Sequence, residues 1–155
     1  MSLNKIIIGF IVLLLIVSGI VLFQLNKTSP LPKTTVTIDK QDFSVEVATT
    51  SAQQQQGLSG RGSMPKNSGM LFIFKTAQKY PFWMKDMKFP LDMIFINDNK
   101  IVDIIPNTPA PKNGNDNLPI YTPAAPDNQT LEINAGLAKQ YGFKKGDAVK
   151  VAPIK

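Results

Sequence analysis

The stretch MIFINDNKIVDII, residues Met93 to Ile105, decides the fold of this chain. Two runs rich in β-branched and aromatic residues, 93–96 and 101–105, favour β-strands. The four polar residues between them, 97–100, are typical of a tight turn. The pattern therefore predicts two consecutive strands joined by a short connection.

Similar short runs of strand-forming residues recur on both sides of this pair, at 34–38, 43–48, 69–74, 81–85, 130–134 and 148–152. Short helices are predicted at 50–57, where Thr50 or Ser51 can cap the first turn and Gly57 ends it, and at 137–141. Residues 106–128 are rich in Pro and Asn and predict a long surface excursion. We therefore expect an α+β, predominantly β fold, a single compact barrel-like sheet domain with two short helices, and not alternating βαβ units.

The amino-acid composition limits the kinds of catalytic, disulfide and metal sites that the chain can form. The chain has 155 residues, 17 basic and 11 acidic side chains, and neither cysteine nor histidine. Disulfides, cysteine nucleophiles, serine–histidine catalysis and the usual zinc sites are therefore excluded. Carboxylate, lysine, arginine, hydroxyl and backbone groups remain, and we predict no cofactor and no metal site.

The N-terminal part is expected to meet a membrane. Residues 6–23 (IIIGFIVLLLIVSGIVLF) carry no charge, and 18 helical residues span about 27 Å, close to the roughly 30 Å of a bilayer core. This predicts a cytoplasmic tail at 1–5, a single-pass signal anchor at 6–23, a polar linker at 24–33 and an extracytoplasmic domain at 34–155. A cleaved signal peptide, which would give a secreted domain, is the alternative.

The positive charge is concentrated in one window. Residues 61–88 carry five of the six net charges, through Arg61, Lys66, Lys75, Lys79, Lys85, Lys88 and one acid, Asp86. With three aromatic residues among them, these cations could face a phosphate, a carboxylated polymer or anionic lipid headgroups. The alternative is that they are ordinary solvent-facing lysines that protect sheet edges. No nucleic-acid-binding module is recognisable, so nucleic acid is not an expected partner.

Five ordered motifs carry a family resemblance: GLSGR at 57–61, GMLFIF at 69–74, FWMK at 82–85, PLDMIFI at 90–96 and LEINAG at 131–136. In this order and spacing they resemble the prokaryotic family known as domain of unknown function 192, over roughly residues 45–151. The resemblance implies one compact β-rich domain, commonly found behind a signal sequence or an anchor. It implies no established reaction.

The same motifs contain the candidate ligand-binding residues Arg61, Trp83, Lys85, Asp92 and Glu132. Arg61 follows two turn-forming glycines and could grip a carboxylate or phosphate, and Trp83 offers a broad stacking face. Asp92 is an exposed cap or a partner for a cation such as Arg61. Glu132 lies on the opposite strand face from its apolar neighbours, either exposed or in the same cleft. The alternatives are a structural Arg61–Asp92 ion pair and a core position for Trp83.

These residues predict a binding or accessory module for a small anionic or carbohydrate-like ligand, or for an envelope protein partner. A purely structural member of an envelope complex is a third class. An enzyme alternative rests on GSMP at 62–65, which is similar to the serine box of type I signal peptidases. Ser63 would then be the nucleophile and a strand lysine such as Lys100 the base, with its pKa lowered by burial. Residues 144–147 (KKGD) match only the end of that family's lysine box.

Overall fold

The computed structural model of the chain describes residues 11–18, 30–112 and 114–155. It divides into two units, Met1–Pro30 and Leu31–Lys155. In the first unit, residues 11–18 are helical with exposed apolar side chains. The predicted tail, the rest of the predicted anchor and most of the predicted linker lie outside the described residues. Within the described ranges, no helix has the length and apolar character needed to cross a membrane.

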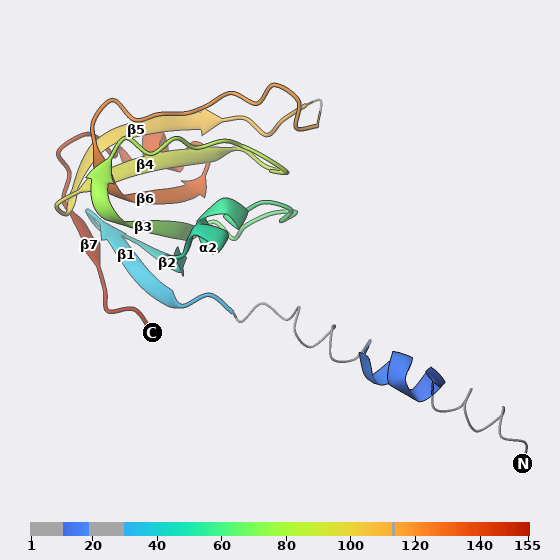
Figure 1. Cartoon of the computed structure of the whole chain (residues 1–155). Helices are drawn as coiled ribbons and strands as arrows, with labels where there is room; N and C mark the ends of the chain where they lie inside the picture. Colours follow the sequence, from blue (N-terminus) through green and yellow to red (C-terminus); the bar gives the residue numbers. More distant parts are fainter. Residues whose placement is uncertain (1–10, 19–29, 113) are drawn as a thin grey trace, which may run out of the picture. The chain divides into compact units, whose positions relative to one another are not determined.

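The second unit is built on one seven-stranded sheet in the order β5-β4-β6-β3-β2-β1-β7 (Figure 1). The strands are β1 (Lys33–Ile38), β2 (Gln41–Ala48), β3 (Ser68–Gln78), β4 (Leu91–Asn97), β5 (Lys100–Thr108), β6 (Asp127–Asn134) and β7 (Val149–Val151). The tight turn predicted from the opening stretch is confirmed. Asp98 and Asn99 join antiparallel β4 and β5, both with positive φ, as a two-residue hairpin turn requires.

The sheet curls until its two edge strands meet at one end. Lys100 of β5 bridges Ala148 next to β7, and the Val149 and Gly146 amides donate to the Asn99 and Ile101 carbonyls, both at 2.8 Å. The domain is therefore a predominantly β half-barrel, which confirms the barrel-like expectation at this level.

Both predicted domain helices are present. Helix α2 (Ser51–Gln56) begins at the N-cap Thr50, whose side chain accepts from the Gln53 amide while the Gln53 side chain accepts from the Thr50 amide. These two hydrogen bonds form a reciprocal capping box at the start of the helix, and the helix ends at Gly57. Helix α3 (Leu137–Tyr141) lies between two glycines in the left-handed region, Gly136 and Gly142.

One connection joins two parallel strands. Strands β2 and β3 pair in parallel, with Val45 opposite Gly69 and Val47 opposite Leu71. A parallel pair needs a crossover, and α2 supplies it. This is a single β–α–β crossover; the other neighbouring strand pairs are antiparallel, so the domain does not consist of alternating βαβ units, as expected from the sequence. The crossover is what brings α2 beside the sheet, as Figure 1 shows next to β2 and β3.

The prediction of a strand at 81–85 was wrong. Residues 79–90 are irregular apart from one bridge between Phe82 and Tyr121. Prolines stand near both ends of this segment and cannot donate to a ladder, and Asp86 turns the chain with a φ of 56°. Two strands are longer than predicted. Strand β3 continues to Gln78, and β5 continues to Thr108.

The sheet buries apolar side chains on both faces. One face packs against α3 and contains Val45, Leu71, Ile94, Leu131 and Ile133 among others. The other face contains Met70, Phe72, Met93 and Phe95, and Leu58, Met84 and Met87 from neighbouring segments pack against them. Alternate residues point to opposite faces, both of which are buried, so β4 and residues 69–74 of β3 are apolar at nearly every position. The second face carries the candidate site.

Candidate ligand-binding site

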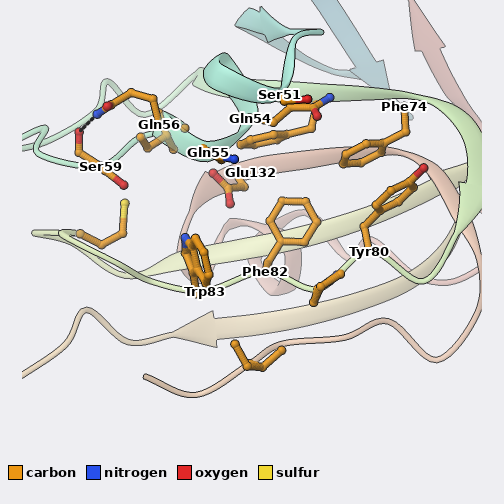
Figure 2. Close-up of a pocket in the computed structure, with 16 residues that line it drawn as sticks. Ser51, Gln54, Gln55, Gln56, Ser59, Phe74, Tyr80, Phe82, Trp83 and Glu132 are labelled. Atoms are coloured by element: carbon orange, nitrogen blue, oxygen red, sulfur yellow. Dashed lines mark hydrogen bonds between the residues drawn. The ribbon is translucent and has the colours of Figure 1, made fainter. Parts of the chain in front are cut away.

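A cavity of about 340 Å³ opens between α2, strands β3 and β6, and the irregular segment around Trp83 (Figure 2). This volume lies within the range of small-molecule pockets. Its walls are formed by Ser51, Gln54, Gln55, Gln56, Gly57, Leu58, Ser59, Phe72, Phe74, Tyr80, Pro81, Phe82, Trp83, Met87, Ile120 and Glu132.

Aromatic rings make up much of the wall. Phe74 and Tyr80 stack with their centroids 3.6 Å apart and their planes 13° from parallel. Phe72 meets Phe82 edge to face, with centroids 5.3 Å apart. Such contacts hold the rings in fixed orientations, so the cavity presents preformed apolar faces.

Glu132 brings a carboxyl group into this apolar surrounding. It lies in the middle of β6, opposite Met70 of β3 on one side and Met93 of β4 on the other. Its residue is 5% exposed, and Figure 2 shows it between the glutamines of α2 and the rings of Phe82 and Trp83. Burial raises the pKa of Glu132 to about 8, so the group is largely protonated at neutral pH.

The mouth of the cavity is shaped by two loops that bind each other. The Ser59 hydroxyl donates to the Lys85 carbonyl at 2.7 Å, and the Gly60 amide donates to the Asp86 carbonyl at 3.0 Å. Gly60 adopts a φ of 79°, a conformation that favours glycine. The GLSGR and FWMK motifs therefore meet in space, and this contact positions the segment that bears Trp83.

Trp83 is 49% exposed and lines the cavity. It is therefore not a core residue, the alternative considered from the sequence. Ile120, 57% exposed, reaches the same opening from the long excursion, whose chain pairs with the Trp83 segment through two backbone hydrogen bonds of 2.8 Å between Phe82 and Tyr121.

Arg61 does not line the cavity and does not pair with Asp92. Its guanidinium binds the carboxylate of Glu46 on β2, and this hydrogen bond lowers the pKa of Glu46. Both side chains are partly exposed. Lys85 is exposed and also lies outside the cavity wall; its backbone carbonyl, and not its ammonium group, contributes to the site by accepting from Ser59.

Asp92 is fully buried, which differs from the expected exposed cap or cation partner. Its carboxylate accepts three backbone hydrogen bonds, from Asn107 at 2.8 Å, Gly136 at 3.0 Å and Ala138 at 2.8 Å. It points to the sheet face opposite Glu132, because its pairing partner in β6 is Ile133. Asp92 therefore ties β5 and the start of α3 to β4.

Several wall residues were not recognised from the sequence. Phe72 and Phe74 alternate with β3 residues of the other face, but without the sheet order they could not be told from core. The α2 glutamines reach the site only through the parallel crossover. Asp127, which is fully buried just beyond the wall, accepts from the Thr130 hydroxyl at 2.8 Å. Burial raises the pKa of Asp127 to about 6.

The serine–lysine arrangement finds no support in the geometry. Ser63 and Lys100 are both exposed, so Lys100 lacks the burial that a lysine base requires. In the KKGD segment, the neighbouring Asp147 raises the pKa of Lys144, which is opposite to what a lysine base needs. Within the described part of the chain, no hydrogen bond joins Ser63 to a lysine.

The fold and the site together define this domain as a half-barrel with an aromatic cavity that contains a buried carboxyl group. Residues 34–151 match the sequence profile of DUF192, described as an uncharacterised ACR family. The chain belongs to this family, and the resemblance seen in its motifs is confirmed. None of the curated proteins compared with the chain matches it.

Two solved structures are similar to the chain. One, from Sinorhizobium meliloti 1021, bears the description "putative transcription regulator"; it is 31% identical, with a TM-score of 0.70, over 81% of this chain and 98% of that one. The other, a protein of unknown function from Novosphingobium aromaticivorans DSM 12444, is 32% identical, with a TM-score of 0.67, over 80% and 94%. Both crystallised chains consist almost entirely of the shared domain. Leu31–Lys155 is a compact unit with two apolar clusters of its own, as expected of an independently folding domain.

Proposed function

We propose that this chain is a small-molecule-binding module held at a membrane, and that the aromatic cavity is its binding site. The observation that carries the proposal is the buried carboxyl group of Glu132 in a preformed aromatic cavity that opens to solvent beside Trp83. Pockets that combine apolar walls with one or a few convergent polar groups are typical of ligand sites.

The cavity favours a ligand with a flat or apolar face over a small anion. Among the described residues that form its wall there is no lysine or arginine, and Arg61 is engaged by Glu46. An anion would also lie against the carboxyl group of Glu132. A ring-bearing molecule, of which a carbohydrate is one kind, fits the stacking faces better. Trp83 and Glu132 are the predicted residues that keep a ligand contact in this proposal.

A ligand screen on residues 31–155 tests the site. Sugars, cell-wall fragments and ring-bearing metabolites are added, and binding is followed by thermal shift and by the fluorescence of Trp83, the single tryptophan of the chain. We expect binders to raise the melting temperature, and Trp83→Leu to reduce that increase. Arg61→Ala, a change outside the cavity wall, is the matched control. Binders whose NMR shift changes lie away from the cavity would contradict the proposal.

The membrane part rests on the uncharged segment 6–23. We propose a single-pass anchor that places the domain on the extracytoplasmic side. Flotation with phospholipid vesicles tests it: the full chain should rise with the vesicles, whereas residues 31–155 should stay in the dense fraction. Equal behaviour of the two forms would contradict the anchor without affecting the cavity.

A further inference from the structure

The carboxyl group of Glu132 faces the cavity without a counter-charge. Burial is the cause that raises its pKa, and no hydrogen bond or ion pair in the described part of the chain satisfies this carboxyl group. Buried polar groups in proteins are nearly always hydrogen-bonded, so a buried carboxyl group that faces open space points to a partner from outside.

Several donors around the opening are already used by the protein. The Gln54 side-chain amide donates to the Ile73 carbonyl at 2.9 Å, and that of Gln56 donates to the Ser59 carbonyl at 3.1 Å. The Ser59 hydroxyl is directed at Lys85. The side chains of Ser51, Gln55 and Trp83 remain as donors on a wall that is otherwise largely apolar. The walls therefore suit a molecule with an apolar body and one polar group that faces Glu132.

The aromatic walls favour a positive charge at that polar group. The rings of Phe82 and Trp83 lie next to Glu132, and the ring of Tyr80 lies farther along the same wall, beside Phe74 (Figure 2). Aromatic faces attract ammonium groups, and the attraction strengthens when the cation is removed from water. A ligand cation would supply both the missing donor and the missing counter-charge.

We propose that the cavity binds an organic cation, a primary amine whose ammonium group donates to the Glu132 carboxylate while its apolar body lies on the aromatic walls. This inference deepens the proposed function and rests on it, because it names the chemical class of the ligand for the same cavity. Aromatic and aliphatic primary amines have this chemistry.

Glu132 is the acidic group of the cavity wall, so we expect its ionisation to set the pH dependence of ligand binding. Tyr80 is the other titratable side chain among the residues of the cavity wall. Glu46 lies in the same row of the sheet, opposite Met70, but two strands away and paired with Arg61. The facing residues of the adjoining strands, Met70 and Met93, carry no charge.

Amine binding must therefore release a proton. With a pKa of about 8, roughly 1% of Glu132 is ionised at pH 6 and half at pH 8. A primary amine that stays protonated over this range should bind about 50-fold more tightly at pH 8 than at pH 6. A neutral alcohol of the same shape can accept from protonated Glu132, so its affinity should not rise with pH.

The test compares benzylamine with benzyl alcohol on residues 31–155, followed by Trp83 fluorescence and calorimetry. We expect benzylamine to bind more tightly as the pH rises from 6 to 8, and to release about 0.9 proton per molecule at pH 7, measured as the difference between buffers of different ionisation enthalpy. Benzyl alcohol should show neither effect. Glu132→Gln should abolish the amine preference, whereas the control Glu46→Gln should leave it unchanged.

The outcomes separate the two proposals. Benzyl alcohol that binds as tightly as benzylamine at pH 8, or benzylamine that binds without proton release, would overturn the cation class and leave the cavity as a binding site. If neither probe, nor any molecule of the wider screen, perturbs Trp83 or the cavity resonances, the binding site itself is refuted. The proton release is measured on the unmodified domain, so the test does not depend on how Glu132→Gln folds.

Discussion

The substitution Asp92→Asn should destabilise the domain strongly while leaving the cavity chemistry intact. The Asp92 carboxylate is fully buried and accepts backbone hydrogen bonds from Asn107 and Gly136 on one oxygen and from Ala138 on the other. An asparagine at this position replaces one acceptor oxygen by an NH₂ group. That group would face a backbone N–H, so one pair of donors would oppose each other without water between them.

The magnitude follows from these contacts. Hydrogen bonds to charged groups contribute about 1.5–3 kcal/mol each, and a buried donor left without an acceptor costs about 1–3 kcal/mol. Asp92→Asn keeps one oxygen, so we expect the free energy of unfolding to fall by about 3 kcal/mol. Asp92→Ala loses all three bonds, and we expect a loss of about 4–6 kcal/mol. A domain with a total stability of about 5–15 kcal/mol can fail to fold after such a loss.

Urea unfolding of residues 31–155, followed by Trp83 fluorescence and circular dichroism, measures this loss. The control is Asp42→Asn, where an exposed carboxylate accepts a single hydroxyl bond of 2.6 Å from Thr37. This change should alter stability by less than about 0.5 kcal/mol. If Asp92→Asn unfolds at the same urea concentration as the unmodified domain but loses ligand binding, the structural role assigned to Asp92 is refuted.

Three further predictions concern other positions. A Cβ atom at Gly69 would lie 2.6 Å from the backbone carbonyl oxygen of Glu132, so Gly69→Ala should lower the unfolding free energy by about 2–3 kcal/mol by urea titration; Gly62→Ala, with no atom within 4 Å of the new Cβ, should change it little. Because the pKa of Glu132 is raised from 4.5 to about 8, the folded state holds a proton that the unfolded state has lost over this range. Its contribution to stability is therefore complete below pH 4.5 and falls by up to about 1.4 kcal/mol per pH unit towards pH 8. Paired denaturation of the unmodified domain and Glu132→Gln across this range should show their difference shrinking and then reversing; a constant difference would disprove the burial argument. Arg61→Ala should cost less than about 1 kcal/mol, since its pair with Glu46 is partly exposed, and cavity affinity measured by fluorescence should stay within twofold.

Local chemistry was sufficient to predict the elements whose signals lie close together in the chain. The Asp98-Asn99 turn, the Thr50–Gln53 capping box and the short helix between Gly136 and Gly142 are each decided by a few neighbouring residues. The alternation of apolar and polar side chains in β1 and β2 likewise needs only the period of a strand. The predicted strand at 81–85 failed because tertiary contacts prevailed over local propensity: Phe82 packs its ring against Phe72 and Phe95, and its backbone pairs only with Tyr121.

The candidate site was predicted only in part. Trp83 and Glu132 were selected and do line one cavity, because a broad aromatic face and a mid-strand carboxylate are conspicuous in the sequence. Asp92 and Arg61 were expected to face each other, but pairing between distant residues depends on strand order, which no local pattern reveals. In the structure each binds a different group, Asp92 the backbone and Arg61 Glu46.

The sequence by itself therefore determined the β-rich class of the domain, its turns and caps, its family and the absence of thiol and imidazole chemistry, since all of these depend on residue types and short spacings. Only the tertiary structure decided that β2 and β3 run parallel, that α2 thereby lies beside them at the cavity, and that Glu132 lies buried there among aromatic rings. The physical reason is that the pKa and the hydrogen-bond partners of a carboxyl group depend on the groups around it, and those groups belong to residues far away in the chain.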